Sequence, residues 1–293
     1  MSPAGALDLC RFLHDAAAML LWGSFAYLAW LVPQALAEDV ARGLRPLRNA
    51  AIALVVLTLL AALPLRAAML GEGWGDATNL ETLRAVLFET TIGSSWQNQA
   101  ACALLLLGAL FVPRRQRRAA IAVASGLLLA SLASIGHTAL HQGGLRIAHM
   151  LNDAVHVLCA GGWLGALVPL LPVLRALDDP ARRADAGCAL RNFSRVGHGV
   201  VALVLLSGLA NTLLVLGRLP TDFASPYQAL LAAKIVLVGA MVCLALANRY
   251  VLVPRLSRSG GAETALRSGI FAEIALGLVV IGLVAVFGML EPV

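Results

Sequence analysis

The chain alternates between long apolar segments and short loops that carry arginine. A helix needs roughly 20 apolar residues to cross a bilayer core of about 30 Å. Eight segments reach that length, over residues 10–36, 49–70, 96–113, 119–140, 147–172, 196–217, 227–253 and 269–290. Together they take up most of the 293 residues. The sequence therefore predicts an all-α membrane bundle of about eight transmembrane helices, in a single domain over residues 1–293.

Composition supports this fold class and excludes several others. The chain is 60% hydrophobic and 13% charged, with a mean hydropathy of +0.84. Soluble domains are about 45–50% apolar and about 25% charged, so a cytosolic enzyme, a disordered protein and a secreted disulfide scaffold are excluded. The net charge of +6 would suit nucleic acid only if the basic residues formed one face, and here they lie between apolar segments. The five cysteines show no short pairing, so neither a disulfide framework nor a zinc knuckle is expected.

The arginines predict the orientation in the membrane. Sixteen of them follow the first, third, fifth and seventh segments, whereas the opposite loops carry few. Because cytoplasmic loops are enriched in Lys and Arg, both termini are expected on the periplasmic side. The loops at 71–95, 141–146 and 218–226 then also face outward. The first of these is too polar to span, and its apolar spacing predicts a short helix at the membrane interface.

Every histidine of the chain lies in or beside a predicted span, where a polar group is costly unless it has a partner. His14, His137 and His149 are expected near the outer ends of three helices, and His156 lies about 10 Å further in than His149. His198 falls in the cytoplasmic half of its own span. This distribution indicates an outer metal-binding cluster followed by a deeper step. His141, at the loop edge, has no assigned role.

The segment 147–172 carries His149, Asp153 and His156 on one helical stripe, with Asn152 beside it. A carboxylate next to a metal-binding imidazole fixes its tautomer, so these residues favour a metal site with Asp153 and Asn152 as supporting groups. The alternative is a polar seam that only ties helices together by hydrogen bonds. Two further residues are weaker candidates as soft ligands for Cu(I), namely Met150 and Cys10.

Other intramembrane polar residues are interpreted as structural. Glu273 and Arg249 both lie toward the cytoplasmic side and are predicted to pair, while Asn211 and Asn248 are predicted to bridge helices. Lys234 leaves two interpretations open. Its ammonium either extends outward to the interface or repels cations from part of the interior.

An ordered series of residues resembles the CopD family of bacterial copper-resistance membrane proteins. The matching positions are Arg11 to His14, Gly136 to Thr138, His149, Asn152, Asp153, His156, Trp163 to Gly165, Arg191 to Ser194, Gly197, His198, Ser207, Gly208, Asn211, Tyr227, Leu230, Lys234, Ala247 to Tyr250, Pro254, Glu273 and Leu290 to Pro292. The most specific region is 125–293. His141 lies outside the motif.

The resemblance implies an inner-membrane protein that moves copper from periplasm to cytoplasm, beside a small periplasmic copper-binding partner of the CopC type. It implies roles for His14, His137, His149, Asp153, His156 and His198, and more loosely for Trp163 and Glu273. Metal binding requires neutral imidazoles, so uptake is expected to weaken as the pH falls through roughly 6.5.

Two other functions fit the same residues. Histidines on facing helices also suit bis-imidazole ligation of haem b, which would make the protein an electron carrier using His14, His137, His149, His156 and His198. An accessory membrane subunit, whose polar residues only join helices, is the third interpretation. An absorbance spectrum with metal analysis of purified protein distinguishes them.

Overall fold

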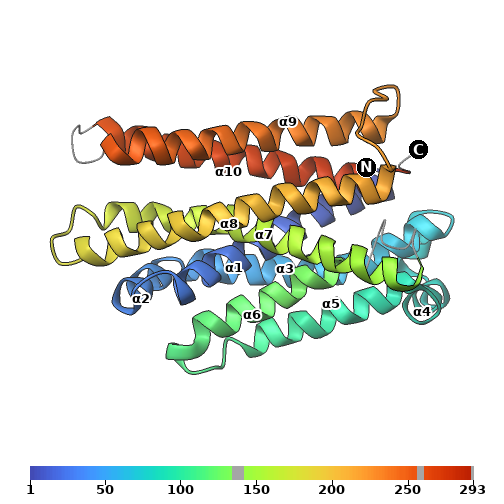
Figure 1. Cartoon of the computed structure of the whole chain (residues 1–293). Coiled ribbons are helices and arrows are strands. Elements are labelled where there is room, and N and C mark those ends of the chain that lie inside the picture. Colours follow the sequence, from blue (N-terminus) through green and yellow to red (C-terminus); the bar gives the residue numbers. More distant parts are fainter. Residues whose placement is uncertain (134–141, 256–260, 292–293) are drawn as a thin grey trace.

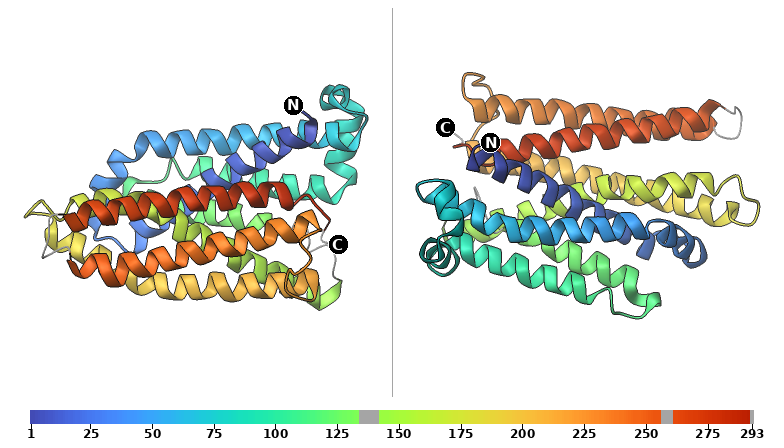
Figure 2. Two further views of the ribbon diagram at one scale, coloured as in Figure 1. Left: turned by 90° about the horizontal axis from the view of Figure 1, so that it is seen from above. Right: turned by 180° about the vertical axis from the view of Figure 1, so that it is seen from behind.

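The computed structural model describes residues 1–133, 142–255 and 261–291, and every regular element in these ranges is helical (Figure 1). The long helices run side by side along one common direction (Figures 1 and 2). Their bounds are α1 Pro3–Trp30, α2 Gln34–Gly43, α3 Arg45–Leu70, α4 Leu80–Glu89, α5 Thr91–Gly108, α6 Arg114–Leu132, α7 Gly143–Arg175, α8 Arg183–Leu216, α9 Pro226–Ala247 and α10 Gly261–Phe287. The predicted all-α fold is therefore confirmed.

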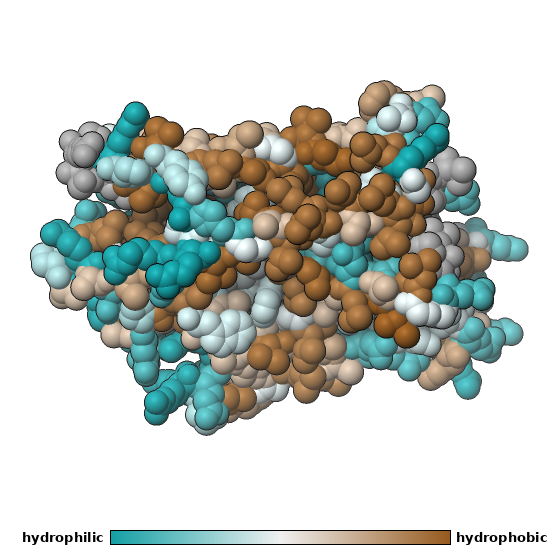
Figure 3. Space-filling model, in the orientation of Figure 1, coloured by the Kyte–Doolittle hydropathy of each residue, from teal (hydrophilic) through white to brown (hydrophobic). Residues whose placement is uncertain are grey.

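Within the described ranges, six helices are long and apolar enough to cross a membrane, namely α1, α3, α7, α8, α9 with the turns that follow it, and α10. Figure 3 shows apolar side chains over the middle of the bundle and hydrophilic side chains toward both ends. The chain is thus a multi-pass membrane protein. The predicted number of about eight spans is not confirmed, because α5 begins with polar residues and α6 with arginines. Residues 134–140 of the predicted span 119–140 lie outside the described residues.

The first predicted span, 10–36, is wrong at its C-terminal end. Helix α1 ends at Trp30, and the separate helix α2 begins at Gln34, directly after Pro33. Proline disfavours the helical conformation in the residue before it, which explains why the helix breaks there. Helix α2 lies at the opposite end of the bundle from both termini (Figure 1).

The short helix predicted in residues 71–95 is present, as α4. A short 3-10 turn, η1 (Trp74–Thr78), precedes it. The side chain of Asn79 caps α4 by accepting hydrogen bonds from the backbone N–H groups of Glu81 and Thr82. Helix α4 lies at the end of the bundle that also holds both termini, in agreement with the prediction that these segments share one side of the membrane (Figures 1 and 2).

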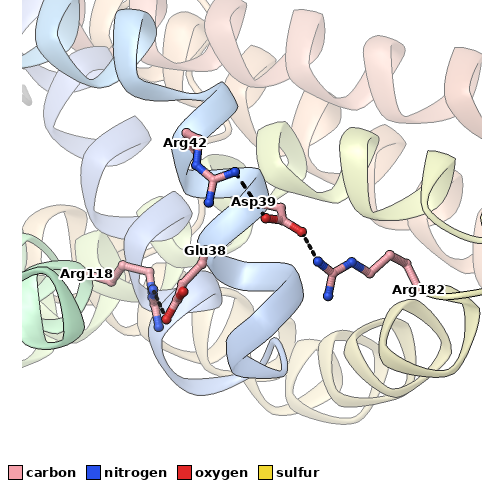
Figure 4. Close-up of polar contacts among 5 residues, drawn as sticks. All are labelled: Glu38, Asp39, Arg42, Arg118 and Arg182. Carbon is pink, nitrogen blue, oxygen red and sulfur yellow. Dashed lines mark hydrogen bonds and ion pairs between the residues drawn. The ribbon is translucent and has the colours of Figure 1, made fainter.

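Ion pairs join α2 to its neighbours at the other end (Figure 4). Asp39 pairs with Arg42 at 3.4 Å and with Arg182 of the α7–α8 connection, and Glu38 lies 3.9 Å from Arg118 of α6. Because most of these side chains are partly exposed, each pair adds little stability. The Asp39–Arg42 pair lies within α2, and the other two pairs link α2 to the start of α6 and to Arg182, the residue before α8.

Helix α1 is central, since it packs against α3, α6, α7 and α10. The backbones of α1 and α7 contact each other directly. A Cβ atom on Gly23 would lie 2.3 Å from the carbonyl oxygen of Gly161 and 2.7 Å from the Cα of Gly165. The Trp22 indole N–H donates to the Leu158 carbonyl at 2.8 Å, and the Ser24 hydroxyl donates to the Gly165 carbonyl at 2.9 Å. These contacts fix the register of the two helices that carry most of the candidate ligands.

We expect Gly23→Ala to destabilise the protein by about 1–3 kcal/mol, because the added methyl group overpacks the α1–α7 contact. Gly199→Ala on α8 is the matched control, since a Cβ atom there meets nothing within 4 Å. Alanine favours helix over glycine, so the control is expected to be neutral or stabilising. Thermal unfolding of the detergent-purified variants measures both effects. Equal stability of Gly23→Ala and wild type would show that the contact is not close.

Candidate metal centre

His14 belongs to α1, and its side chain contacts α3 and is only 6% exposed. Its Nδ1 atom is 2.9 Å from the Oγ1 atom of Thr58. The Thr58 hydroxyl donates its one hydrogen back along α3, to the carbonyl of Leu54 at 2.7 Å or of Val55 at 3.0 Å. We assign the Thr58 hydrogen to one of these two carbonyls, so that Thr58 accepts from His14; in this assignment Nδ1 carries the proton and Nε2 carries the lone pair. That Nε2 atom is buried and has no hydrogen-bond partner among the described residues.

Cys10 lies one turn before His14 and is also buried. Its thiol contacts the same threonine, donating to the backbone carbonyl of Thr58 at 3.2 Å. The two candidates on α1 thus share one partner on α3. The sequence analysis missed Thr58, although a hydroxyl in an otherwise apolar span is a signal that could have directed attention to it.

His149 is buried near the start of α7 and is 2% exposed. It lies twelve residues before Gly161, or about 18 Å along α7, and His14 lies nine residues before Gly23, or about 13 Å along α1. Because Gly23 and Gly161 touch and both helices start at the same end of the bundle, the two histidines lie in the same half of the molecule. His137 and His141, which the sequence places at this level, lie outside the described residues.

His156, further along α7, contacts α8. Its Nδ1 atom lies 3.0 Å from the Ser207 Oγ atom and 3.2 Å from the Val204 carbonyl oxygen. Ser207 uses its own hydrogen toward the carbonyls of Leu203 and Val204, so Nδ1 of His156 is the donor. The lone pair of Nε2 is left for another group, as in His14.

Asn152 and Asp153 form the helix-joining seam that the sequence analysis kept as an alternative. Asn152 donates to the Ser207 carbonyl at 3.0 Å and to the Asn211 side chain at 2.6 Å. Asn211 in turn donates to the Asp153 carboxylate at 2.9 Å. The predicted bridging role of Asn211 is therefore confirmed. Asp153 faces α8, so part of the predicted stripe joins two helices.

His198 lies apart from the others, in the half of α8 that carries the predicted cytoplasmic loop. It is exposed, and both of its ring nitrogens have partners: Nδ1 donates to the Ser194 carbonyl at 2.8 Å, and Nε2 accepts from the Tyr250 hydroxyl at 3.0 Å. To bind a metal ion through Nε2, His198 must first release Tyr250.

The predicted pair between Glu273 and Arg249 is wrong. Arg249 donates to the Ser194 carbonyl at 2.6 Å. Glu273 instead accepts from Asn248 at 2.7 Å and from the indole of Trp163 at 3.3 Å. The reason is the π-helical turn η3 (Asn248–Leu252) that ends α9, which directs Asn248 toward α10 and Arg249 toward α8. Asn248 thus bridges helices as predicted.

A cavity of about 320 Å³ lies between α7, α8, α9 and α10 and reaches α1. Its lining is mostly apolar, with His156, Lys234, Asp15 and Trp163 as the main polar side chains. Lys234 therefore faces the interior, which answers the question of its direction that the sequence left open. Asp15 was missed, although a carboxylate next to His14 within a span meets the same cost as the histidines.

No group of three or more His, Cys, Asp or Glu side chains in the described ranges lies close enough to hold a metal ion. Trp163 supports Glu273, and Met150 is half-buried beside His149. Whether the predicted ligands act together stays a prediction, because one of them, His137, lies outside these ranges.

Comparison with known proteins decides the family. Residues 1–147 match the model of the copper resistance protein D-like N-terminal domain, and residues 187–287 match that of copper resistance protein D. The chain belongs to the copper resistance protein D family. The resemblance seen in the sequence is thereby confirmed.

Three relatives are similar over most of this chain. Inner membrane protein YebZ of Escherichia coli K12 is 34% identical, covering 96% of this chain and 97% of its own. Copper resistance protein D of Pseudomonas syringae pv. tomato is 31% identical over 85% of this chain and 84% of its own. Copper transport protein CutJ of Bacillus subtilis is 30% identical over 98% of this chain and 52% of its own. No solved structure matches. The CopD-type chain described here is thus a multi-pass protein of the inner membrane.

We expect Asn211→Ala to destabilise the protein by about 1–3 kcal/mol, because Asp153 and Asn152 both lose a partner. Thr212→Val is the matched control, since the Thr212 hydroxyl donates only within α8, to Gly208. Thermal unfolding in detergent measures the two variants. If Asn211→Ala lowers the unfolding temperature no more than Thr212→Val does, the hydrogen bonds of Asn211 do not hold α7 to α8.

Proposed function

We propose that this protein binds copper at the periplasmic end of its helix bundle and passes it toward the cytoplasm. Two relatives are named for copper resistance and copper transport, which supports copper as the cargo. A small periplasmic copper-binding protein of the CopC type is the partner we propose for delivery. The outer ligands are His14, His149 and His137, the next step is His156, and the innermost is His198.

The observation that carries this proposal is the state of His14. Its Nδ1–H is fixed by Thr58, and the lone pair of Nε2 is buried without a hydrogen-bond donor among the described residues. Such an orphaned acceptor costs about 1–3 kcal/mol. A metal ion that accepts the electron pair removes this cost, and imidazole suits copper in either oxidation state. Ligating histidines commonly have their second ring nitrogen held by a neighbour in this way.

The two inner histidines, His156 and His198, differ in whether a ring nitrogen is available to bind copper. His156 has the same tautomer as His14, with Nδ1–H held by Ser207 and Val204. His198 has both nitrogens engaged, so copper there must displace Tyr250. We therefore propose that the outer site captures copper and that the inner histidines bind it more weakly as it moves through.

The first test measures copper stoichiometry and affinity of purified protein by titrating Cu(I) against a coloured competing chelator. We expect His14→Ala and His149→Ala to lose the tightest-bound copper. His198→Ala is the control and is expected to keep it, because that side chain lies at the other end of the bundle. Unchanged copper binding in both outer variants would overturn the proposal.

The second test addresses the role of Thr58. Thr58→Val keeps the shape of the side chain but removes the acceptor that orients His14, so we expect copper affinity to fall about 10–100-fold. Ser125→Ala is the matched control, since Ser125 is a buried hydroxyl that bonds only within its own helix. If both variants bind copper as the wild type does, His14 is not a ligand oriented by Thr58.

The absorbance spectrum of the same preparation tests the haem b alternative. Bis-histidine haem gives an intense Soret band, whereas the copper proposal expects a preparation without one. A stoichiometric Soret band that His14→Ala or His149→Ala abolishes would replace copper by haem as the ligand of these residues.

A further inference from the structure

Lys234 is a partly buried charged side chain that lines the cavity between the helices of the bundle. It lies eight residues after Pro226, where α9 begins, or about 12 Å along the helix axis. No hydrogen bond or ion pair of the described residues reaches its ammonium group, whose Nζ atom lies over the Phe287 ring at 5.9 Å from the ring centre. An ionisable residue inside a membrane domain indicates a functional site, so the missing partner needs an explanation.

The charged groups around Lys234 do not supply that partner. Asp153 on α7 attracts the ammonium group electrostatically but is itself bonded by Asn211. Asp15 on α1 lines the same cavity and interacts with Arg11. Asp153 therefore supplies negative charge near Lys234 without a hydrogen bond to its ammonium group. What the ammonium lacks is a hydrogen-bond acceptor, and a neutral one is sufficient.

The cavity that Lys234 lines opens sideways, toward the lipid. Helices α8 and α9 contact each other little in the described structure, and both line the cavity. The lining residues Leu205 and Leu209 of α8 are 46% and 49% exposed, and Ile235 of α9 is 47% exposed. These three side chains form the mouth of the cavity. A molecule dissolved in the bilayer can reach Lys234 between them without crossing water.

His156 of α7 and Lys234 of α9 line the same cavity, and these two helices make few contacts with each other. The tautomer derived above leaves Nε2 of His156 as an acceptor, whereas Lys234 is a donor. The cavity thus offers one donor and one acceptor on two different helices, and the Trp163 indole and the side chains of Met19 and Met241 also line it. Its volume of about 320 Å³ lies at the lower end of the range of small-molecule sites.

We propose that this cavity binds the head group of an isoprenoid quinol from the membrane. One hydroxyl of the quinol donates to Nε2 of His156, the oxygen across the ring accepts from Lys234, and the isoprenoid tail leaves between α8 and α9. The head group is flat and neutral, so it can lie at the depth of Lys234. A phospholipid phosphate or a fatty-acid carboxylate carries a charge and belongs at the interface. This site goes beyond the proposed copper function and does not require it.

The experiment measures binding of decylubiquinol to the copper-free protein in detergent by isothermal titration. We expect saturable binding to the wild type. Lys234→Met, which keeps the length of the side chain but removes its donors, is expected to weaken binding at least tenfold. Ile235→Trp is expected to weaken it similarly by filling the mouth. Val236→Trp is the control, because Val236 is 71% exposed on α9 and does not line the cavity.

Each other outcome contradicts the proposal. Equal binding to wild type and to both cavity variants would show partition into detergent only. Oleate or dodecyl phosphate binding in a Lys234-dependent manner, with no binding of decylubiquinol, would show a site for an anionic lipid. The copper titration described above is run on the same variants, so a failure of copper binding and a failure of quinol binding are seen separately. If Lys234→Met does not fold, Ile235→Trp and its control still decide the question.

Discussion

The close approach of α1 and α7 is the contact on which the candidate site depends. Three glycines, Gly23, Gly161 and Gly165, allow the two backbones to touch, and the side chains of Trp22 and Ser24 bond to carbonyls of α7 across the contact. In a bilayer there is little hydrophobic drive for helices to associate, so close packing and interhelical hydrogen bonds must supply it. With this register fixed, one helix presents Cys10, His14 and Asp15 and the other presents its polar stripe.

A second principle recurs at His14 and His156. In each, a hydroxyl that already donates to its own helix accepts the Nδ1 proton: Thr58 for His14, and Ser207 for His156. This arrangement removes the ambiguity of the imidazole tautomer and leaves Nε2 as a lone-pair donor in an apolar setting.

The sequence predicted the features that follow from one-dimensional patterns. Apolar length predicted the membrane bundle, arginine placement predicted termini at one end, and the cost of burying polar groups drew attention to His14, His149 and His156. The sequence-based prediction failed where a local change in backbone geometry decides which residues meet. Pro33 splits the first predicted span, and the π-helical turn at Asn248 sends Arg249 away from Glu273. Thr58 was overlooked because a single threonine is ordinary in an apolar helix until its partner is known.

The position of Lys234 explains how copper could bind at an inner step without being trapped there. A cation bound at His156 would feel the positive charge of Lys234 across the same cavity, whereas one bound at His14 lies on the other side of α1, toward α3. On the proposed path, we therefore expect copper to bind less tightly at His156 than at His14. Movement through a membrane site requires binding strong enough for capture and weak enough for release. An unpaired lysine beside the second histidine meets that requirement.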